Sequence, residues 1–243
     1  MRVFLAGASG AIGRPLVRLL REAGHDVTGT ARMEQGQDEL RRLGCTAINV
    51  DVFDAEKLTR VVADARPDVV IHQLTSLPRD RAGLAQPAVG EANARIRREG
   101  TANIVRAAEQ AGAKRIIAQS IAWAYAPKTP PYLETDPLDV DATGARATTV
   151  TGGIVPLETA VMTSAQLDGV VLRYGVLYGP GTWAETPPRP SPLHVEAAAF
   201  AALLATDRGP SGIYNIAEPG SEVSGEKAAS LLGWRHDFRL ASP

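Results

Sequence analysis

The sequence contains one cysteine, Cys45, among its 243 residues. A single cysteine excludes an internal disulfide and any metal site built from several cysteines. Because Cys45 follows Gly44 and precedes an apolar stretch, we expect a small core residue rather than a reactive thiol. The four histidines show no metal-ligand spacing, so no metal site is expected.

An excess of one charge and a long apolar run are also missing. The 26 basic and 27 acidic residues give a net charge of -1, which argues against binding nucleic acid or membranes through general basicity. The longest apolar run, residues 197–205, is too short to span a bilayer. Gly7 and Gly10 interrupt the apolar N-terminal segment, which argues against a signal peptide. We therefore expect a cytoplasmic protein with a small-molecule substrate.

Short apolar runs alternate with helical patterns along most of the chain. Strands are predicted over seven segments, residues 3–6, 26–30, 47–50, 69–74, 115–120, 170–174 and 212–217. Helices are predicted over residues 12–23, 37–43, 54–65, 88–111, 195–206 and 224–232. Continuous apolar strands fit a parallel sheet covered on both faces. The alternation predicts an α/β fold with a Rossmann-type, doubly wound parallel sheet.

The most informative motif lies between the first strand and the first helix and reads G-x-x-G-x-x-G. Glycines supply φ freedom for a tight turn, and their missing side chains let backbone N–H groups approach a pyrophosphate at the positive end of the helix. This context predicts a dinucleotide-binding loop, with a tight turn that binds nothing as the alternative. The expected contacts are Gly7, Ser9, Gly10, Ala11, Ile12 and Gly13.

The end of the second strand favours NADP over NAD. An acidic residue there binds the ribose 2′-hydroxyl of NAD, whereas an arginine suits the 2′-phosphate of NADP. The strand ends without an acid and is followed by Arg32, and Arg14 is a second candidate just past the third glycine. Asp51, after the third strand, is placed to accept a hydrogen bond from the adenine amino group. The alternatives are an exposed loop arginine and a plain turn residue.

Further motifs follow in the order found in extended and atypical short-chain dehydrogenase/reductases. The family's D-x-x-D, V-V-I-H-x-A-A, G-T-x-N-L, L-R-x-x-x-x-Y-G-P-G and H-V-D resemble residues 51–54, 69–75, 100–104, 172–181 and 194–196. The chain most resembles the NAD-dependent epimerase/dehydratase branch. This resemblance implies a dinucleotide-binding Rossmann domain over residues 1–175. It also implies a small substrate lobe over residues 176–243, partly interleaved with that domain.

The resemblance implies more cofactor contacts and a possible homodimer. Relatives often use the long helix, residues 88–111 here, for dimer contacts. The segment after the fourth strand should lie beside the nicotinamide-side ribose and phosphates, and the segment after the sixth strand should flank the nicotinamide ring. The contacts carried over by position are Val52, Leu74, Thr75, Tyr174, Gly175 and Val176.

The family's usual acid/base residues are missing. In the family, a tyrosine exchanges a proton with the substrate oxygen, and a lysine four residues later holds the ribose and lowers the tyrosine pKa. Counting back from Glu158, which matches a family glutamate, places these two positions at Val150 and Ile154. Neither side chain exchanges protons. Pro156 also lies in the presumed helix, so we expect that helix to begin near Val155.

Two other polar residues are candidates for catalysis. Aligning Tyr125 with the family's Y-G tyrosine places the family's substrate-orienting hydroxyl at Ile121, and Ser120 is one residue early. A hydrogen-bonded structural serine is the alternative for Ser120.

We expect His72 to be a structural hydrogen-bonding residue and His194 to cap a helix or line the cleft. The charge-rich stretch 95–99 is expected to be a solvated helix face rather than a phosphate-binding patch.

Three functions are compatible with this sequence. The first hypothesis is an NADP-dependent oxidoreductase acting on a small carbonyl or alcohol, with protonation by a displaced residue or by water. The second is a non-catalytic, NADP-binding regulator or redox sensor. The third is an epimerase or dehydratase acting on a sugar-nucleotide-like substrate, against which the short C-terminal lobe counts.

Overall fold

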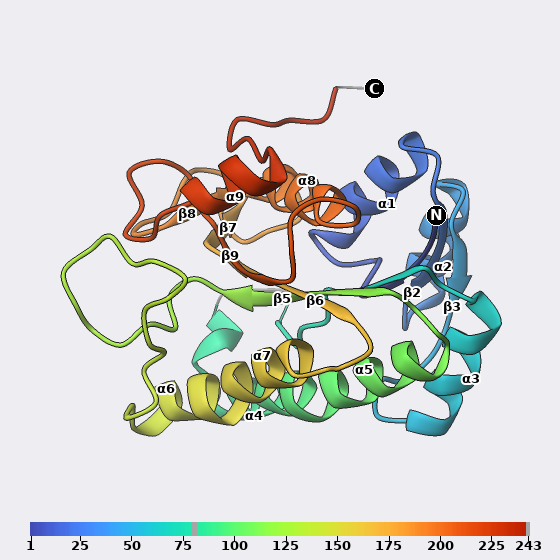
Figure 1. Ribbon diagram of the computed structural model, residues 1–243, viewed down its shortest axis with the longest axis horizontal. Coiled ribbons are helices and arrows are strands. Elements are labelled where there is room, and N and C mark those ends of the chain that lie inside the picture. The colour runs from blue at the N-terminus through green and yellow to red at the C-terminus, as the bar shows by residue number, and fades with distance from the viewer. Residues whose placement is uncertain (79–81, 242–243) are drawn as a thin grey trace.

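A seven-stranded parallel sheet forms the centre of the computed structural model, which describes residues 1–78 and 82–241. The strand order is β3-β2-β1-β4-β5-β6-β9, the arrangement of a doubly wound fold, and it confirms the predicted fold class (Figure 1). The strands are β1 (Arg2–Ala6), β2 (Asp26–Thr30), β3 (Thr46–Ile48), β4 (Val69–His72), β5 (Arg115–Ile121), β6 (Asp168–Tyr174) and β9 (Gly212–Ile216). A separate parallel pair consists of β7 (Val176–Tyr178) and β8 (Pro192–His194).

Helices cover both faces of the sheet (Figure 1). One face carries α1 (Gly13–Glu22), α2 (Glu34–Arg42), α8 (Val195–Leu204) and α9 (Glu226–Leu232). The other carries α3 (Ala55–Ala65), α4 (Pro87–Arg95), α5 (Thr101–Gln110), α6 (Gly144–Thr149) and α7 (Val155–Met162). Within the described part of the chain, no helix combines the length and apolar character needed to cross a membrane.

Alternate residues of β1 enter two separate cores. Val3 and Leu5 pack among the residues of α1, α2 and α8, whereas Phe4 and Ala6 pack among those of α3, α5 and α7. Because both faces are buried, the central strands contain unbroken apolar runs, such as residues 3–6 and 69–71, rather than alternating with polar residues. This is the physical reason why the unbroken apolar runs predicted the sheet correctly.

Two smaller predictions are also confirmed. Cys45 is 4% exposed, and burial raises the pKa of its thiol to about 11, so it is a core residue without thiolate character at neutral pH. Asp54 caps α3, since its carboxylate accepts a hydrogen bond from the Lys57 N–H at 3.0 Å.

Helix α7 begins at Val155, as predicted, but the chain is already helical from Gly144 onwards. A π-helical turn, η3 (Val150–Ile154), joins α6 to α7, and the Val155 N–H reaches back five residues to the Val150 carbonyl. Pro156 lacks an N–H, so an α-helical bond to the Gly152 carbonyl cannot form. Arg98 fills that place by donating from Nη1 to the Gly152 oxygen at 3.1 Å. The helix therefore passes through the proline instead of starting there.

A second π-helical turn faces the first. The predicted long helix 88–111 is confirmed in extent, but it consists of α4, the turn η2 (Ile96–Gly100) and α5. The two turns touch closely, since a Cβ built at Gly153 of η3 would lie 3.2 Å from Arg97 Cδ of η2. This contact aligns α4–α5 with α6–α7 on one face of the sheet.

We predict that Gly169→Ala destabilises the fold by about 1–3 kcal/mol, as overpacking does. A Cβ at Gly169 would lie 2.4 Å from the Val161 carbonyl oxygen, a backbone atom of α7 that has no room to move. Gly90→Ala in helix α4 is the matched control, because its Cβ would lie 3.9 Å from the Thr148 methyl group, an ordinary contact distance. The control should gain up to about 1 kcal/mol. Urea denaturation measures both, and equal stabilities of the two variants would contradict this packing.

Candidate functional site

The glycine-rich loop is built so that backbone, and not side chain, faces its ligand. Gly7 has a φ of +89°, and its N–H donates to the Thr30 hydroxyl at 2.9 Å. A Cβ at Gly13 would lie 2.2 Å from the Gly7 oxygen, and one at Gly7 would lie 2.8 Å from the Gln73 oxygen. Helix α1 therefore begins directly on the loop, with its N-terminal N–H groups toward the place a pyrophosphate takes. The loop fits a dinucleotide.

The two arginines considered for the 2′-phosphate differ in their partners. The Arg14 guanidinium is paired with the Glu39 carboxylate at 3.0 Å. Arg32 is exposed, and among residues 1–78 and 82–241 its side chain has no hydrogen-bond or ion-pair partner. Its carbonyl accepts from the Asn49 amide at 3.3 Å, which fixes its backbone after β2. Arg32 is thus the better-placed cation for an added phosphate.

Asp51 and Val52 follow β3 at the same end of the sheet. One oxygen of the exposed Asp51 carboxylate accepts from the Phe53 N–H at 2.9 Å, and its other oxygen is not bound in this turn. The Val52 side chain packs on η2, 3.2 Å from where a Cβ of Gly100 would lie. The adenine contact expected for Asp51 stays a prediction.

His72 has the predicted structural role. Its Nδ1 accepts from the Leu74 N–H at 3.2 Å, so Nε2 carries the ring proton and donates to the Thr101 hydroxyl at 3.0 Å. Burial lowers the pKa of His72 to about 4, and the positive charge of Arg97 adds to this effect. The neutral ring fixes the backbone of residues 73–75, where nicotinamide-side contacts are expected.

The segment after β6 meets the site with its backbone. The Tyr174 ring is 1% exposed, and its hydroxyl accepts from the Gln73 amide and donates to the Ala198 carbonyl, both at 3.3 Å. Burial raises the pKa of this hydroxyl. At Gly175, a Cβ would lie 2.4 Å from the Ser191 oxygen, so β8 packs directly on the backbone. Contacts of residues 174–176 with a nicotinamide ring stay a prediction.

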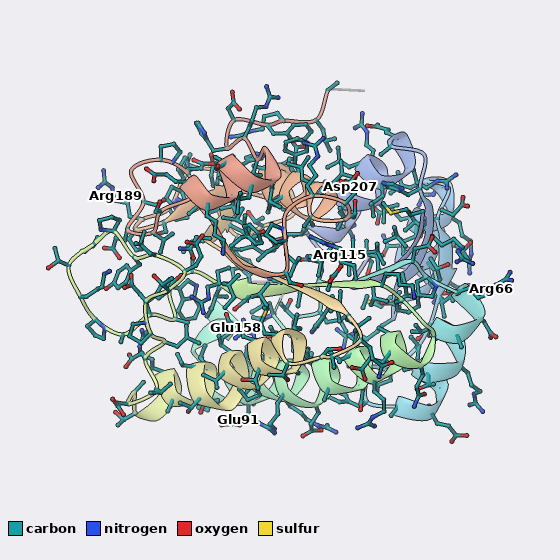
Figure 2. All side chains as sticks on the ribbon, in the orientation of Figure 1. Arg66, Glu91, Arg115, Glu158, Arg189 and Asp207 are labelled. Atoms are coloured by element: carbon teal, nitrogen blue, oxygen red, sulfur yellow. The ribbon has the colours of Figure 1, made fainter. Side chains whose placement is uncertain are left out.

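Ser120, Glu158 and Arg173 form one buried network. The Arg173 guanidinium binds both Glu158 oxygens, Nε at 2.9 Å and Nη2 at 2.6 Å, and the Ser120 hydroxyl donates to the same carboxylate at 2.7 Å. Arg173 is 3% exposed, and Glu158 lies between α7 and the sheet (Figure 2). Hydrogen bonding and attraction to the carboxylate outweigh burial and raise the pKa of Arg173. The network joins β5, α7 and β6.

Tyr125 extends this network. Its hydroxyl donates to the Asn215 side-chain oxygen at 2.6 Å, and the Arg173 guanidinium lies 4.8 Å from its ring centre. Burial raises the pKa of Tyr125. The hydroxyl protons of both Ser120 and Tyr125 are therefore already donated within the protein. The catalytic roles of these two residues stay predictions.

The positions predicted for the family's tyrosine and lysine lie in the π-helical turn η3. Val150 and Ile154 are both 0% exposed and pack with Ile121 and Ala124. Apolar contact with the end of β5 thus replaces any proton-exchanging group at these two positions.

Arg97 departs from the solvated helix face that the sequence predicted. Arg95 and Arg98 are exposed and bind Glu99, as expected, whereas Arg97 is half-buried, with its Cδ 3.2 Å from where a Cβ of Gly153 would lie. The four-residue spacing of a helix could have indicated this burial, because Arg97 lies four residues from both buried Asn93 and buried Thr101.

The segment after β7 crosses over the glycine-rich loop. The Trp183 indole N–H donates to the Pro78 carbonyl at 3.2 Å, and a Cβ at Gly181 would lie 3.8 Å from Ala11 Cα. His194 caps α8 by accepting from the Glu196 N–H at 3.3 Å, which confirms the predicted cap. Part of the C-terminal segment therefore borders the cradle.

Comparison with known proteins gives a family and one informative relative. The sequence pattern of the NAD dependent epimerase/dehydratase family matches residues 3–207. A 3-diazoavenalumate denitrifying reductase of a Streptomyces species is 46% identical over 183 residues, which cover 75% of this chain. The match covers 58% of that relative, which is less than two thirds of its length.

Solved structures share the fold at low sequence identity. A UDP-glucose 4-epimerase of Thermotoga maritima, solved with UDP-glucose, superposes with a TM-score of 0.77 at 19% identity, covering 98% of this chain and 94% of its own. The UDP-glucose 4-epimerase of Thermus thermophilus, solved with NAD, gives a TM-score of 0.77 at 21% identity, covering 99% and 95%. At these identities the likeness concerns the fold alone.

We predict that stability falls as the pH drops from 6.5 toward 4. The unfolded chain protonates His72 at its ordinary pKa of 6.5, whereas the folded chain does so only at about 4. The unfolded state therefore binds more protons in this window, and the free energy of unfolding decreases by up to about 3 kcal/mol. His72→Gln should lack this part of the decrease. The difference between wild type and variant, from urea titrations at several pH values, measures it; parallel curves would contradict the buried neutral histidine.

Glu158→Gln should destabilise the protein by about 3–5 kcal/mol, because it leaves the buried Arg173 charge without its partner. The control is Glu99→Gln in η2, which removes two solvent-exposed ion pairs, with Arg95 and Arg98, and should cost below about 1 kcal/mol. Thermal and urea unfolding compare the two. Similar losses for both variants would show that the buried pair contributes no more than a surface one.

Proposed function

The chain belongs to the NAD dependent epimerase/dehydratase family, and on that premise we propose that it is an NAD(P)H-dependent reductase that works without the tyrosine–lysine pair. The observation behind this proposal combines two features. The glycine-rich loop fits a dinucleotide, and the positions predicted for the pair hold two buried apolar residues, Val150 and Ile154. The reductase relative supports an oxidoreductase-type enzyme.

The loop of residues 7–13 would hold the pyrophosphate through backbone N–H groups. The side chain of Arg32 would bind a 2′-phosphate, because it is exposed and has no partner within the described residues, whereas Arg14 is already paired. These residues favour NADPH, with NADH as the alternative.

The missing acid restricts the substrate. A carbonyl becomes an alkoxide on reduction and must take a proton, which here would come from water or a displaced residue. An aryl diazonium group needs no proton. With the reduced dinucleotide bound as hydride donor, its reduction would give the arene, N₂ and the oxidised dinucleotide. Because the reductase relative is named for a diazo substrate, we place diazo compounds first and small carbonyls second.

The segment 176–243 is proposed as the substrate lobe. Its contribution near the cradle is the stretch 179–184, held to Pro78 through Trp183.

Binding and turnover test the proposal in two steps. First, NADPH or NADH is mixed with the protein, and fluorescence enhancement and thermal shift are recorded. Then loss of NADPH absorbance is followed with aryl diazonium salts, aldehydes, ketones, quinones and enones. Turnover with any class supports the reductase. Binding of neither dinucleotide overturns the proposal; tight binding without turnover favours the regulator, and interconversion of UDP-sugars without net NADPH loss favours the epimerase.

Arg32→Asp should reverse the preference between NADPH and NADH by about tenfold or more, since a charge-assisted hydrogen bond to the 2′-phosphate is replaced by repulsion. Dissociation constants of both cofactors, from fluorescence titration, measure the ratio. Arg14→Ala serves as the control, because Arg14 is occupied by Glu39 and its loss should change the ratio far less. An unchanged ratio in Arg32→Asp would show that the 2′-phosphate lies elsewhere.

A further inference from the structure

Arg97 is a half-buried cation for which the described residues supply no counter-ion. Within residues 1–78 and 82–241 its guanidinium has no hydrogen-bond or ion-pair partner, whereas both neighbouring arginines of the same helix bind Glu99. Burial lowers the pKa of Arg97 to about 10, so it stays charged at neutral pH. A charge that is partly removed from water and has no partner destabilises a protein, which makes a ligand the expected partner.

The place of Arg97 narrows the choice of ligand. Its Cδ packs where a side chain at residue 153 would stand, so Gly153 makes room for it directly beside Ile154, the predicted lysine position. On the other side its charge acts on His72, whose ring holds the Leu74 N–H. The carbonyl of Gln73, the residue between His72 and Leu74, lies against Gly7 of the glycine-rich loop. Arg97 therefore lies between the lysine position and the backbone that lines the cradle.

We propose that the Arg97 guanidinium holds the nicotinamide half of the dinucleotide by donating to its ribose-hydroxyl and phosphate oxygens. Arg97 would thus hold the ribose from the helix α4–α5, whereas the family's lysine holds it from the helix that corresponds to α6–α7. This inference rests on the proposed function. Arg97 is a positioning residue here, because the hydride acceptor need not touch it.

The test uses the full chain with Arg97→Gln and Arg97→Lys, and Arg106→Gln, at an exposed arginine of α5, as the matched control. Three quantities are measured without any substrate: the melting temperature of the ligand-free protein, the dissociation constant of NADPH, and that of adenosine 2′,5′-bisphosphate. The last ligand lacks the nicotinamide ribose and its phosphate. If wild type prefers NADH, then NADH and AMP replace them.

Arg97→Gln should weaken NADPH binding about 10- to 100-fold, as loss of charge-assisted hydrogen bonds does, and leave adenosine bisphosphate binding unchanged. The melting temperature of the ligand-free protein should stay equal or rise, because an unpaired buried charge is removed. Arg97→Lys should retain part of the affinity, and Arg106→Gln should bind as wild type.

Three results would overturn this role. Unchanged NADPH binding in Arg97→Gln, with or without a raised substrate KM, would assign Arg97 to the substrate or to nothing. Equal loss of both ligands, or a lowered melting temperature of the ligand-free protein, would make it structural. In all three cases wild type still binds NADPH, whereas failure of wild type to bind either dinucleotide refutes the proposed function itself.

Discussion

The bidentate ion pair between Glu158 and Arg173 fixes how the helix α6–α7 sits on the sheet. It crosses from α7 to β6, and the Ser120 hydroxyl binds the same carboxylate from β5. Two charges removed from water require this full set of hydrogen bonds, so the pair tolerates little displacement of its three elements. The register of α6–α7 is thereby set, and with it the positions of Val150 and Ile154 over the end of β5.

Pro156 and the two π-helical turns determine what lies between the helices. Because Pro156 removes one N–H, the Gly152 carbonyl turns outward and takes a hydrogen bond from Arg98. That bond and the close approach of Gly153 to Ala94 bring η3 against η2. In η2 the consecutive residues Arg97 and Arg98 lie on different sides of the helix, so Arg97 is half-buried and Arg98 is exposed. The local backbone therefore decides which arginine can reach a ligand.

The sheet and the cradle could be predicted because their causes are local in sequence. Unbroken apolar runs such as Val69–Ile71 indicate a strand buried on both faces, and glycines at positions 7 and 13 indicate a turn without room for side chains. The start of α6–α7 was not predictable from Pro156 alone, because a π-helical turn depends on the carbonyl partner that Arg98 supplies from another helix. The partial burial of Arg97 was also missed, because a run of charged residues suggests a solvated helix face when the neighbouring helix is not known.

The isoleucine at residue 154, the position predicted for the family's lysine, is physically compatible with the nearby Arg97. Arg97 packs against residue 153, and a lysine at the next position would bring a second desolvated cation toward the same space, where like charges repel most. Valine and isoleucine at 150 and 154 instead pack against Ile121 and leave one positive charge there. The tyrosine also loses its purpose in this arrangement, since its acidity depends on a neighbouring lysine. Under the proposed function, the Arg97 guanidinium would supply the positive charge that binds the ribose. The site would then suit a substrate whose reduction requires no proton.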